Sequence, residues 1–467
     1  CRDWSSDVCS SDLGLPSTYV GDTGEAQTLE IILRDDKLGL QAALQYTIFE
    51  DLPVITRSVR LDNVGPHHLA VDSAYSASLD LPDADWDMIT LSNAWSRESE
   101  AERVPLRTGG QGVSSLDGRS SKHAGPFVML TRPGADETHG EAIGVSLAYS
   151  GNFDIGVNVS SLGGVRLRAG INPELFRWRL EPGESFQTPE ALIVHSDQGL
   201  GALSRTFHTL LRTRMARGPW RDRRRPVALN TYEALYMNVD ERNVMELADQ
   251  AADLGMELVV VDDGWFGQRD WDDASIGDWA AHPVKFPRGL KPVADHVHGL
   301  GLKFGLWFEP EMVNLDSDLA REHPEWILAA PEAVPYREDL SYRAQYVLDL
   351  VNPDAYRHVY GQMAELVGRL GVDYIKWDHN REVTEPMHGG RFGLHEQTEA
   401  CYRLFDDLKA QFPGLEIESC SSGGARTDAG ILQHADRIWA SDSNDPCDRV
   451  DIQRWTELIV PPEMIGA

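Results

Sequence analysis

The sequence predicts a protein of two domains, an antiparallel β-sandwich followed by a (β/α)8 barrel of the TIM type that is cut short after about six βα units. Short strands of alternating polarity fill the first part, and buried strands alternate with amphipathic helices after Pro226. We place the boundaries at 14–198 for a sandwich incomplete at its start, 199–225 for a connecting helix and linker, and 226–467 for a barrel incomplete at its end.

The strands expected in the sandwich are short, evenly spaced and separated by turn residues. They run from 28 to 33, 40 to 48, 55 to 64, 70 to 81, 127 to 130, 142 to 147, 153 to 159 and 187 to 194. Residues 93–123 are polar and rich in Gly, Ser and Arg, which predicts a long loop. The spacing of Leu203, Phe207 and Leu210 predicts an amphipathic helix over 200–215.

In the second domain each expected strand is followed by a helical pattern. The strands are 227–229, 257–261, 302–308, 372–377, 415–419 and 437–441, and the helices are 241–254, 291–300, 353–370, 395–412, 428–434 and 448–460. Repeated βα units of this kind indicate a parallel sheet. A closed barrel needs two further units, so we expect the chain to stop inside this domain.

Charge and hydropathy exclude two classes of partner. The net charge of -31 argues against nucleic acid, whose phosphates would be repelled. A basic cluster, Arg212 to Arg225, is the exception, and we interpret it as a solvated linker. No apolar run reaches the roughly 18 residues of a membrane span.

The N-terminal segment 1–13 resembles a translated sequencing adapter joined to a gene fragment, so we exclude it as a non-native leader. The cysteines that remain are Cys401, Cys420 and Cys447, an odd and sparse set. This favours a reducing compartment, and we expect a cytoplasmic protein. Secretion stays open, because a signal peptide could precede the fragment.

Polar and aromatic residues follow all six strands of the second domain. They are Asn230, Tyr232 and Glu233; Asp262 and Asp263; Trp307, Glu309 and Glu311; Lys376 and Asp378; Glu418 and Cys420 to Gly424; and Asp442, Asn444 and Asp445. Barrel enzymes keep their chemistry at these strand ends. Carboxylates accept hydrogen bonds from hydroxyls and indoles stack on sugar C–H surfaces, so a sugar site is predicted.

Lys376 and Asp378 lie two residues apart in one strand and therefore point to the same side. A carboxylate beside an ammonium stays ionised and can act as a nucleophile, although such a pair can also be a solvated ion pair.

Other candidates also have a structural interpretation. Asp262 and Asp263 can cap a loop, Glu309 and Glu311 can pair with arginines, and Cys420 can be a small buried apolar residue. Asp445 and Asp448 are typical of helix caps. The histidines form no spaced ligand set, so we expect neither a metal nor a cofactor.

Six motifs, in order, resemble the bacterial α-galactosidases of glycoside hydrolase family 36. They are NTYEALY at 230–236, VDDGW at 261–265 with GDW at 277–279, GLWFEPEMVN at 305–314, KWDHNR at 376–381, ESCSSGGARTD at 418–428 and WASDSNDPCDRVDIQ at 439–453. Upstream, Ala94, Trp95, Arg97, Glu98 and residues 105–127 are similar to the family's N-terminal sandwich.

The resemblance implies a retaining mechanism, with Asp378 as nucleophile and Asp442 as general acid/base. In such enzymes the two carboxyls lie roughly 5 Å apart, and the acid/base holds a proton because its pKa is raised. The resemblance also assigns sugar contacts: Asp262 and Asp263 to the 4-OH and 6-OH, Lys376 and Arg343 to the 3-OH side, Trp307 to the galactose face, and Cys420 and Gly423 to the 2-OH.

The resemblance further implies a tetramer, in which loops near Trp95 approach a neighbour's site. We therefore expect an exo-α-galactosidase that hydrolyses raffinose-type oligosaccharides. Leu229 and Tyr232 stand where the family commonly has tryptophans, which bears on the leaving-group preference. A galactosyl transglycosylase, an α-N-acetylgalactosaminidase, a metal-dependent sugar isomerase or aldolase, and an inactive sugar-binding fragment remain as alternatives.

Overall fold

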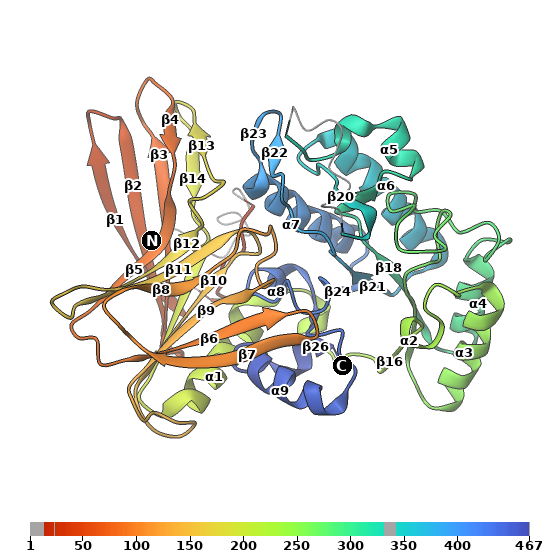
Figure 1. Ribbon diagram of the computed structural model, residues 1–467, viewed down its shortest axis with the longest axis horizontal. Coiled ribbons are helices and arrows are strands. Elements are labelled where there is room, and N and C mark those ends of the chain that lie inside the picture. The colour runs from red at the N-terminus through yellow and green to blue at the C-terminus, as the bar shows by residue number, and fades with distance from the viewer. Residues whose placement is uncertain (1–13, 23, 331–341, 467) are drawn as a thin grey trace.

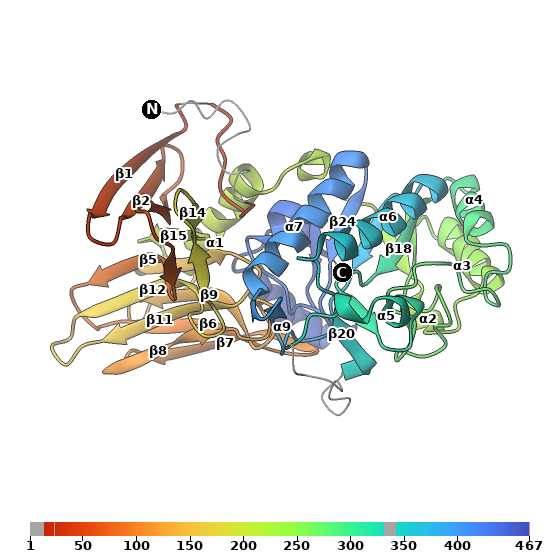
Figure 2. The same ribbon diagram turned by 90° about the horizontal axis from the view of Figure 1, so that it is seen from above.

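The computed structural model describes residues 14–22, 24–330 and 342–466, and the statements below concern these residues. The expected leader 1–13 lies outside them. A β-rich N-terminal domain, coloured red to yellow, lies beside an α/β domain coloured green to blue (Figure 1; Figure 2).

Antiparallel sheets make up the N-terminal domain. Within the described residues, nine strands form the larger sheet, in the order β1-β2-β3-β15-β10-β9-β6-β7 with β14 beside β3, and four form the smaller sheet, β5-β12-β11-β8. The bounds are β1 Ala26–Asp35, β2 Leu40–Phe49, β3 Val54–Asn63, β5 Ala74–Leu81, β6 Asp87–Ala94, β7 Arg97–Pro105, β8 Gly109–Ser114, β9 Ala124–Thr131, β10 Ala142–Ala148, β11 Phe153–Val159, β12 Val165–Ile171, β14 Ser185–Gln187 and β15 Glu190–Ser196. A short pair, β4 (Leu69–Val71) with β13 (Trp178–Leu180), completes the domain.

The sandwich core consists of apolar side chains that occupy every second position along the strands. In β11 every second side chain, from Phe153 through Ile155 and Val157 to Val159, is buried. A strand with this period of two has one apolar face, which must pack against another element. Burying such side chains stabilises the fold by about 1.5–3 kcal/mol each.

The prediction of a long loop at 93–123 is wrong, because this segment contains all of β7 and all of β8. Strand β7 is charged and largely exposed at the sheet edge, and β8 is glycine-rich, so neither alternates in hydropathy. At Gly112 a Cβ would meet Ile155 O at 2.3 Å, which explains the glycine. The strand expected at 70–81 is divided between β4 and β5, and β12 was not predicted.

The connecting helix is α1 (Gly199–Leu210), which continues as the π-helical turn η2 (Leu211–Met215). The basic cluster begins in this turn and is solvated only in part: Arg217, Arg221, Arg223 and Arg224 are exposed as predicted, whereas Arg212 and Arg214 make ion pairs. Arg214 is buried and donates to Glu25 at 2.5 Å, and Arg212 pairs with Glu463. Their acidic partners lie far away in the sequence, so local composition could not reveal them.

The second domain is a parallel, open half-barrel. Over the described ranges its strands follow the order β16 (Ala228–Asn230), β17 (Leu258–Val261), β18 (Lys303–Phe308), β21 (Tyr374–Trp377), β24 (Glu416–Ser419), β25 (Arg437–Trp439) and β26 (Ile465–Gly466). The helices include α2 (Tyr232–Leu235), α3 (Glu241–Asp253), α4 (Lys291–Gly299), α5 (Asp318–Glu322), α6 (Pro353–Leu370), α7 (Leu394–Gln411), α8 (Ile431–His434) and α9 (Pro446–Thr456).

All six predicted strands and helices of this domain are present, with ends displaced by a few residues. The seventh strand, β26, was missed because two residues give no periodicity. Two short antiparallel pairs were also missed: β19 (Met312–Asn314) with β20 (Gln345–Val347), and β22 (Met387–His388) with β23 (Arg391–Phe392). Across the described ranges, no helix combines the length and apolar character that a membrane crossing requires.

Candidate active site

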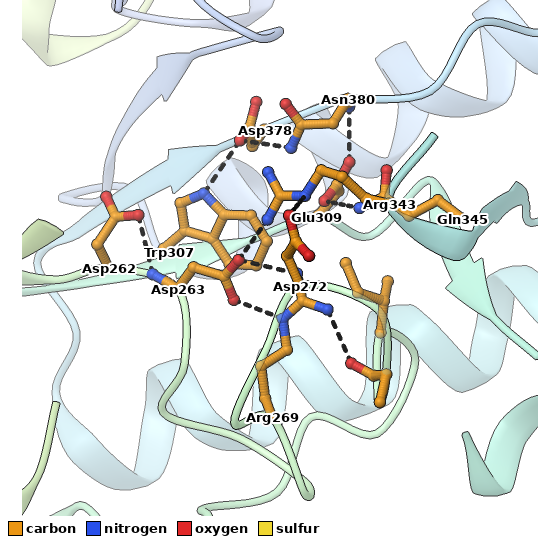
Figure 3. Close-up of polar contacts among 12 residues, drawn as sticks. Asp262, Asp263, Arg269, Asp272, Trp307, Glu309, Arg343, Gln345, Asp378 and Asn380 are labelled. Carbon is orange, nitrogen blue, oxygen red and sulfur yellow. Dashed lines mark hydrogen bonds and ion pairs between the residues drawn. The ribbon is translucent and has the colours of Figure 1, made fainter. Parts of the chain in front are cut away.

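The carboxyl ends of five neighbouring strands bring most of the predicted site residues together (Figure 3). Asp262 and Asp263 follow β17, Asp378 follows β21 and Asp442 lies beyond β25. Parallel strands end at the same edge of a sheet, which is why residues from distant motifs meet here.

Asp378 is a buried carboxylate that accepts four hydrogen bonds. Its Oδ1 accepts from His379 N at 2.8 Å and Ser422 N at 3.2 Å. Its Oδ2 accepts from Asn380 Nδ2 at 2.8 Å and Trp307 Nε1 at 3.2 Å. Burial alone would raise the pKa of Asp378, but Lys376 and these donors outweigh it and lower the pKa. The predicted ionised carboxylate is therefore supported by its surroundings.

Lys376 donates to Asp262 Oδ2 at 3.0 Å, and Asn230 Nδ2 donates to the same oxygen at 2.5 Å. Burial would lower the pKa of Lys376, but Asp262 and other acidic neighbours, which include Asp378 and Asp442, raise it well above its ordinary value. Lys376 is thus a buried cation that interacts electrostatically with both Asp378 and Asp442. Lys376 and Asp378 are therefore not the solvated ion pair of the alternative interpretation.

Asp263 lies between two arginines. Arg269 Nε and Nη2 bind its two oxygens at 2.7 and 2.8 Å, and Arg343 Nη2 binds Oδ2 at 2.7 Å. The pKa of Asp263 would rise through burial, but both guanidinium groups lower it. Arg343 and Ala344 have φ of 55° and 49°, and Asn314 Nδ2 donates to both of their carbonyls. Backbone of this kind persists at functional sites when neighbours hold it.

Asp442 accepts hydrogen bonds from two indole groups, whereas Asp378 accepts from backbone N–H groups, an amide and one indole. Trp439 Nε1 donates to Oδ1 at 2.9 Å, and Trp95 Nε1 donates to Oδ2 at 2.8 Å. Trp95 belongs to the β6–β7 turn of the N-terminal domain and is 62% exposed. The resemblance placed this region near a neighbouring subunit, whereas the structure brings Trp95 to the site of its own chain.

The segment that contains Cys420 and Gly423 adjoins both carboxylates. Cys420 is buried, and burial together with Asp378 raises the pKa of its thiol well above the ordinary value. Gly423 has φ of +80°, and a Cβ there would lie 2.5 Å from Glu98 Oε1 and 3.0 Å from Asp442 N. Only glycine fits this close approach of the N-terminal domain.

Trp307 is 1% exposed and stacks on Phe266, with 6.0 Å between the ring centroids. Its indole nitrogen faces Asp378, so here it acts as a hydrogen-bond donor. Trp95 is exposed and Trp439 half-buried, and these two rings offer more accessible aromatic surface beside Asp442.

The two glutamates after β18 have different roles. Glu311 binds Arg426 Nη1 at 2.7 Å and lies 3.3 Å from His379 Nδ1, as the structural interpretation predicted. Glu309 accepts from Gln345 Nε2 at 2.7 Å and from Asn380 N at 2.6 Å. Burial and the charge of Asp378 raise the pKa of Glu309 to about 7.

Asp445 is the N-cap of α9, and its side chain accepts from Cys447 N and Asp448 N. Its predicted capping role is confirmed. For Asp448 the contact is different, because it accepts from Ser443 Oγ. Among the described residues, no group of three or more His, Cys, Asp or Glu is arranged to hold a metal ion.

Sequence reasoning missed several residues of the site. Arg269, Asn380 and Trp439 lie inside the quoted motifs or close to them, so their proximity to the candidate carboxylates was an available signal. Glu98 and Arg119 lie within the upstream segments that resemble the family, but no local pattern indicated that they reach the second domain, since more than 250 positions separate Arg119 from its partner His379.

Comparisons with known proteins agree with this geometry. Residues 185–467 match the family model Melibiase, and residues 7–181 match the glycosyl hydrolase family 36 N-terminal domain. α-Galactosidase AgaA of Geobacillus stearothermophilus is 45% identical over 97% of this chain and 63% of its own length. α-Galactosidase Mel36A of Lactobacillus acidophilus is 40% identical over 97% of this chain and 62% of its own.

The crystal structure of AgaA superimposes with a TM-score of 0.94 at 45% identity, and covers 97% of this chain and 64% of that one. Variants of AgaA in complex with raffinose and with stachyose match with TM-scores of 0.94 and 0.93. The chain spans somewhat less than two thirds of the length of these relatives. The two family models and the shared fold establish that the chain belongs to glycoside hydrolase family 36.

Proposed function

We propose that the protein is a retaining exo-α-galactosidase that removes terminal α-D-galactosyl residues from raffinose-type oligosaccharides. The observation that carries this proposal is the pair Asp378 and Asp442 on either side of the segment Ser422–Gly423: Ser422 N donates to Asp378 Oδ1 at 3.2 Å, and a Cβ at Gly423 would lie 3.0 Å from Asp442 N. Asp378 is buried and held ionised by its donors, and Asp442 is half-buried.

In the first step Asp378 attacks the anomeric carbon and forms a glycosyl ester, while Asp442 gives its proton to the departing oxygen. In the second step Asp442 takes a proton from water while the water oxygen attacks the anomeric carbon, the bond from that carbon to Asp378 breaks, and the carboxylate is released with net retention. The two carboxyl groups and one water molecule balance the protons and electron pairs of both steps.

The residues around the pair suit a galactosyl group. Asp262 Oδ1 accepts from Asp263 N, and Asp262 Oδ2 accepts from Lys376. The carboxylates of Asp262 and Asp263 can each accept further hydrogen bonds from sugar hydroxyls. Lys376 and Arg343 supply donors beside Asp378. Cys420 and Gly423 remain candidates for the 2-OH side. The crystal structures of AgaA variants in complex with raffinose and with stachyose support this substrate class.

The test is hydrolysis of an aryl α-galactoside by the full-length protein that carries this chain, followed by proton NMR. The α-anomer of galactose should appear before mutarotation. Initial release of the β-anomer would refute retention, and no turnover by a folded enzyme would refute the activity. An aryl α-N-acetylgalactosaminide assayed in parallel distinguishes that alternative.

Transglycosylation is a second candidate, and the exposed ring of Trp95 next to Asp442 favours it. An aromatic face at the leaving-group side can hold a second sugar in place of water. Oligosaccharide products that increase with added acceptor would establish transfer, and galactose alone would exclude it. A tetrameric assembly and a cytoplasmic location stay predictions.

A further inference from the structure

Asn380 lies beside Asp378 and close to Glu309 (Figure 3), and three of its atoms make hydrogen bonds. Its backbone N donates to Glu309 Oε1 at 2.6 Å, its Oδ1 accepts from Ser422 Oγ at 2.7 Å, and its Nδ2 donates to Asp378 Oδ2 at 2.8 Å. Asn380 is 3% exposed. A side chain fixed in this way cannot turn away from the carboxylate without leaving buried polar atoms unpaired.

The amide could face Asp378 with either its oxygen or its nitrogen, and the hydrogen-bond network decides which. Arg119 has only donors. Its Nη1 donates to Ser422 Oγ at 3.4 Å and to His379 O at 3.2 Å. The ionised Asp378 carboxylate can only accept, so the donor Nδ2 of Asn380 must face it. Asn380 Oδ1 then accepts from the Ser422 hydroxyl, which itself accepts from Arg119 and is held in place by it.

Arg119 comes from the other domain, between β8 and β9, and is completely buried. It is anchored by an ion pair with Glu382. Gly118, the preceding residue, has φ of +69°, and a Cβ there would lie 2.3 Å from Val383 Cγ2. The segment around Arg119 is thus packed tightly against the chain that follows Asp378.

Glu309 fixes the other end of Asn380. The groups that face Glu309 are Asn380, Gln345, the guanidinium of Arg343 and the carboxylate of Asp378. Glu309 therefore fixes the backbone of Asn380, while Ser422 and Asp378 bind the two ends of its side-chain amide.

We propose that Asn380 is a positioning residue for the nucleophilic carboxylate, and that the N-terminal domain orients it through Arg119 and Ser422. The proposal rests on the proposed function and deepens it. A donor aimed at Oδ2 keeps the carboxylate ionised and fixes the direction of its attacking lone pairs.

The test is the variant Asn380→Ala in the full-length protein. Loss of one preorganised donor should lower kcat/KM about 100-fold. The acidic limb of the kcat/KM profile should move to higher pH, because protonated Asp378 becomes easier to form. Ser422→Ala, which removes only the hydroxyl that donates to Asn380 Oδ1, should move the limb in the same sense by less.

Asn172→Ala is the matched control. Asn172 is buried in the N-terminal domain and donates to Ser115 O and Phe153 O. It should lose thermal stability without a shift of the acidic limb. An unshifted limb in both Asn380→Ala and Ser422→Ala would overturn the proposal.

A 13C titration of the Asp378 carboxyl gives a readout that does not need turnover. The Asp378 carboxyl should titrate at higher pH in Asn380→Ala than in the wild type, in the same direction as the acidic limb of kcat/KM. If the wild type has no α-galactosidase activity but the titration shifts, the proposed function fails while the positioning role stands. If the wild type is active and the titration does not shift, the positioning role fails alone.

Discussion

The surroundings of Asp378 and Asp442 differ in burial and in the domains that supply the hydrogen-bond donors. Asp378 is buried and accepts four hydrogen bonds, two of them from backbone N–H groups of its own domain. Asp442 is half-buried and accepts from two indoles, one of them from the N-terminal domain. A nucleophile must stay charged and fixed, whereas an acid/base must exchange protons and meet varied leaving groups.

The largest effect is expected from Asp378→Ala. Loss of the nucleophile should reduce kcat on the order of 10⁴-fold or more, for aryl galactosides and oligosaccharides alike. Asp445→Ala is a matched control, because that carboxylate caps α9. The control should lose about 1 kcal/mol of stability and keep its activity. Full activity of Asp378→Ala would eliminate the proposed mechanism.

Asp442→Asn should distinguish the role of Asp442 from that of Asp378, because its effect should depend on the leaving group of the substrate. With raffinose, whose leaving group needs a proton, kcat should fall by about 10²–10⁴-fold. With an aryl galactoside whose phenol leaves readily, formation of the ester should change much less. Equal losses on both substrates, measured in the pre-steady state, would contradict the assignment of Asp442 as the acid.

Trp95→Phe tests the contribution of the N-terminal domain to Asp442. The variant keeps a ring but loses the N–H, and kcat/KM should fall about tenfold, as for one hydrogen bond to a charged group. Trp95→Ala, which also removes the ring, should raise KM for oligosaccharides further. If Trp95→Phe matches the wild type, the indole hydrogen bond does not position Asp442.

The smallest effect concerns Glu309, whose pKa of about 7 exceeds the value of about 4.3 in an unfolded chain. Between these values the folded protein binds more protons, so the free energy of unfolding falls as pH rises. The loss approaches about 3 kcal/mol above pH 7, and Glu309→Gln should remove it. Its amide can also donate to Gln345 Oε1, which is buried without a partner among the described residues.

Glu399→Gln is the matched control for this prediction. Burial, followed by the charge of Glu396, raises the pKa of Glu399 to about 7 as well. Both variants should flatten the dependence of Tm on pH between 5 and 8. Only Glu309→Gln should also alter kcat/KM, because Glu309, unlike Glu399, accepts a hydrogen bond from Asn380 N. Identical kinetics for the two variants would mean that Glu309 has a structural role only.

Much of the fold could be predicted because its signals are local. The six strands and helices of the half-barrel follow from periodicity, and the position of Asp262, Asp378 and Asp442 after their strands follows from chain order. Strands β7, β8 and β26 could not be found in this way, since charged, glycine-rich or very short strands carry no alternation.

The sequence by itself thus determined the domain order, the chemistry at the strand ends and the family resemblance, all of which depend on residues close together in the chain. Only the tertiary structure decided that Arg214 of the connecting helix pairs with Glu25, that Trp95 reaches Asp442 and that Arg119 reaches the carbonyl of His379 next to Asp378. It also decided the ionisation of Glu309, because burial and neighbouring charge set a pKa, and both arise only when distant segments pack together.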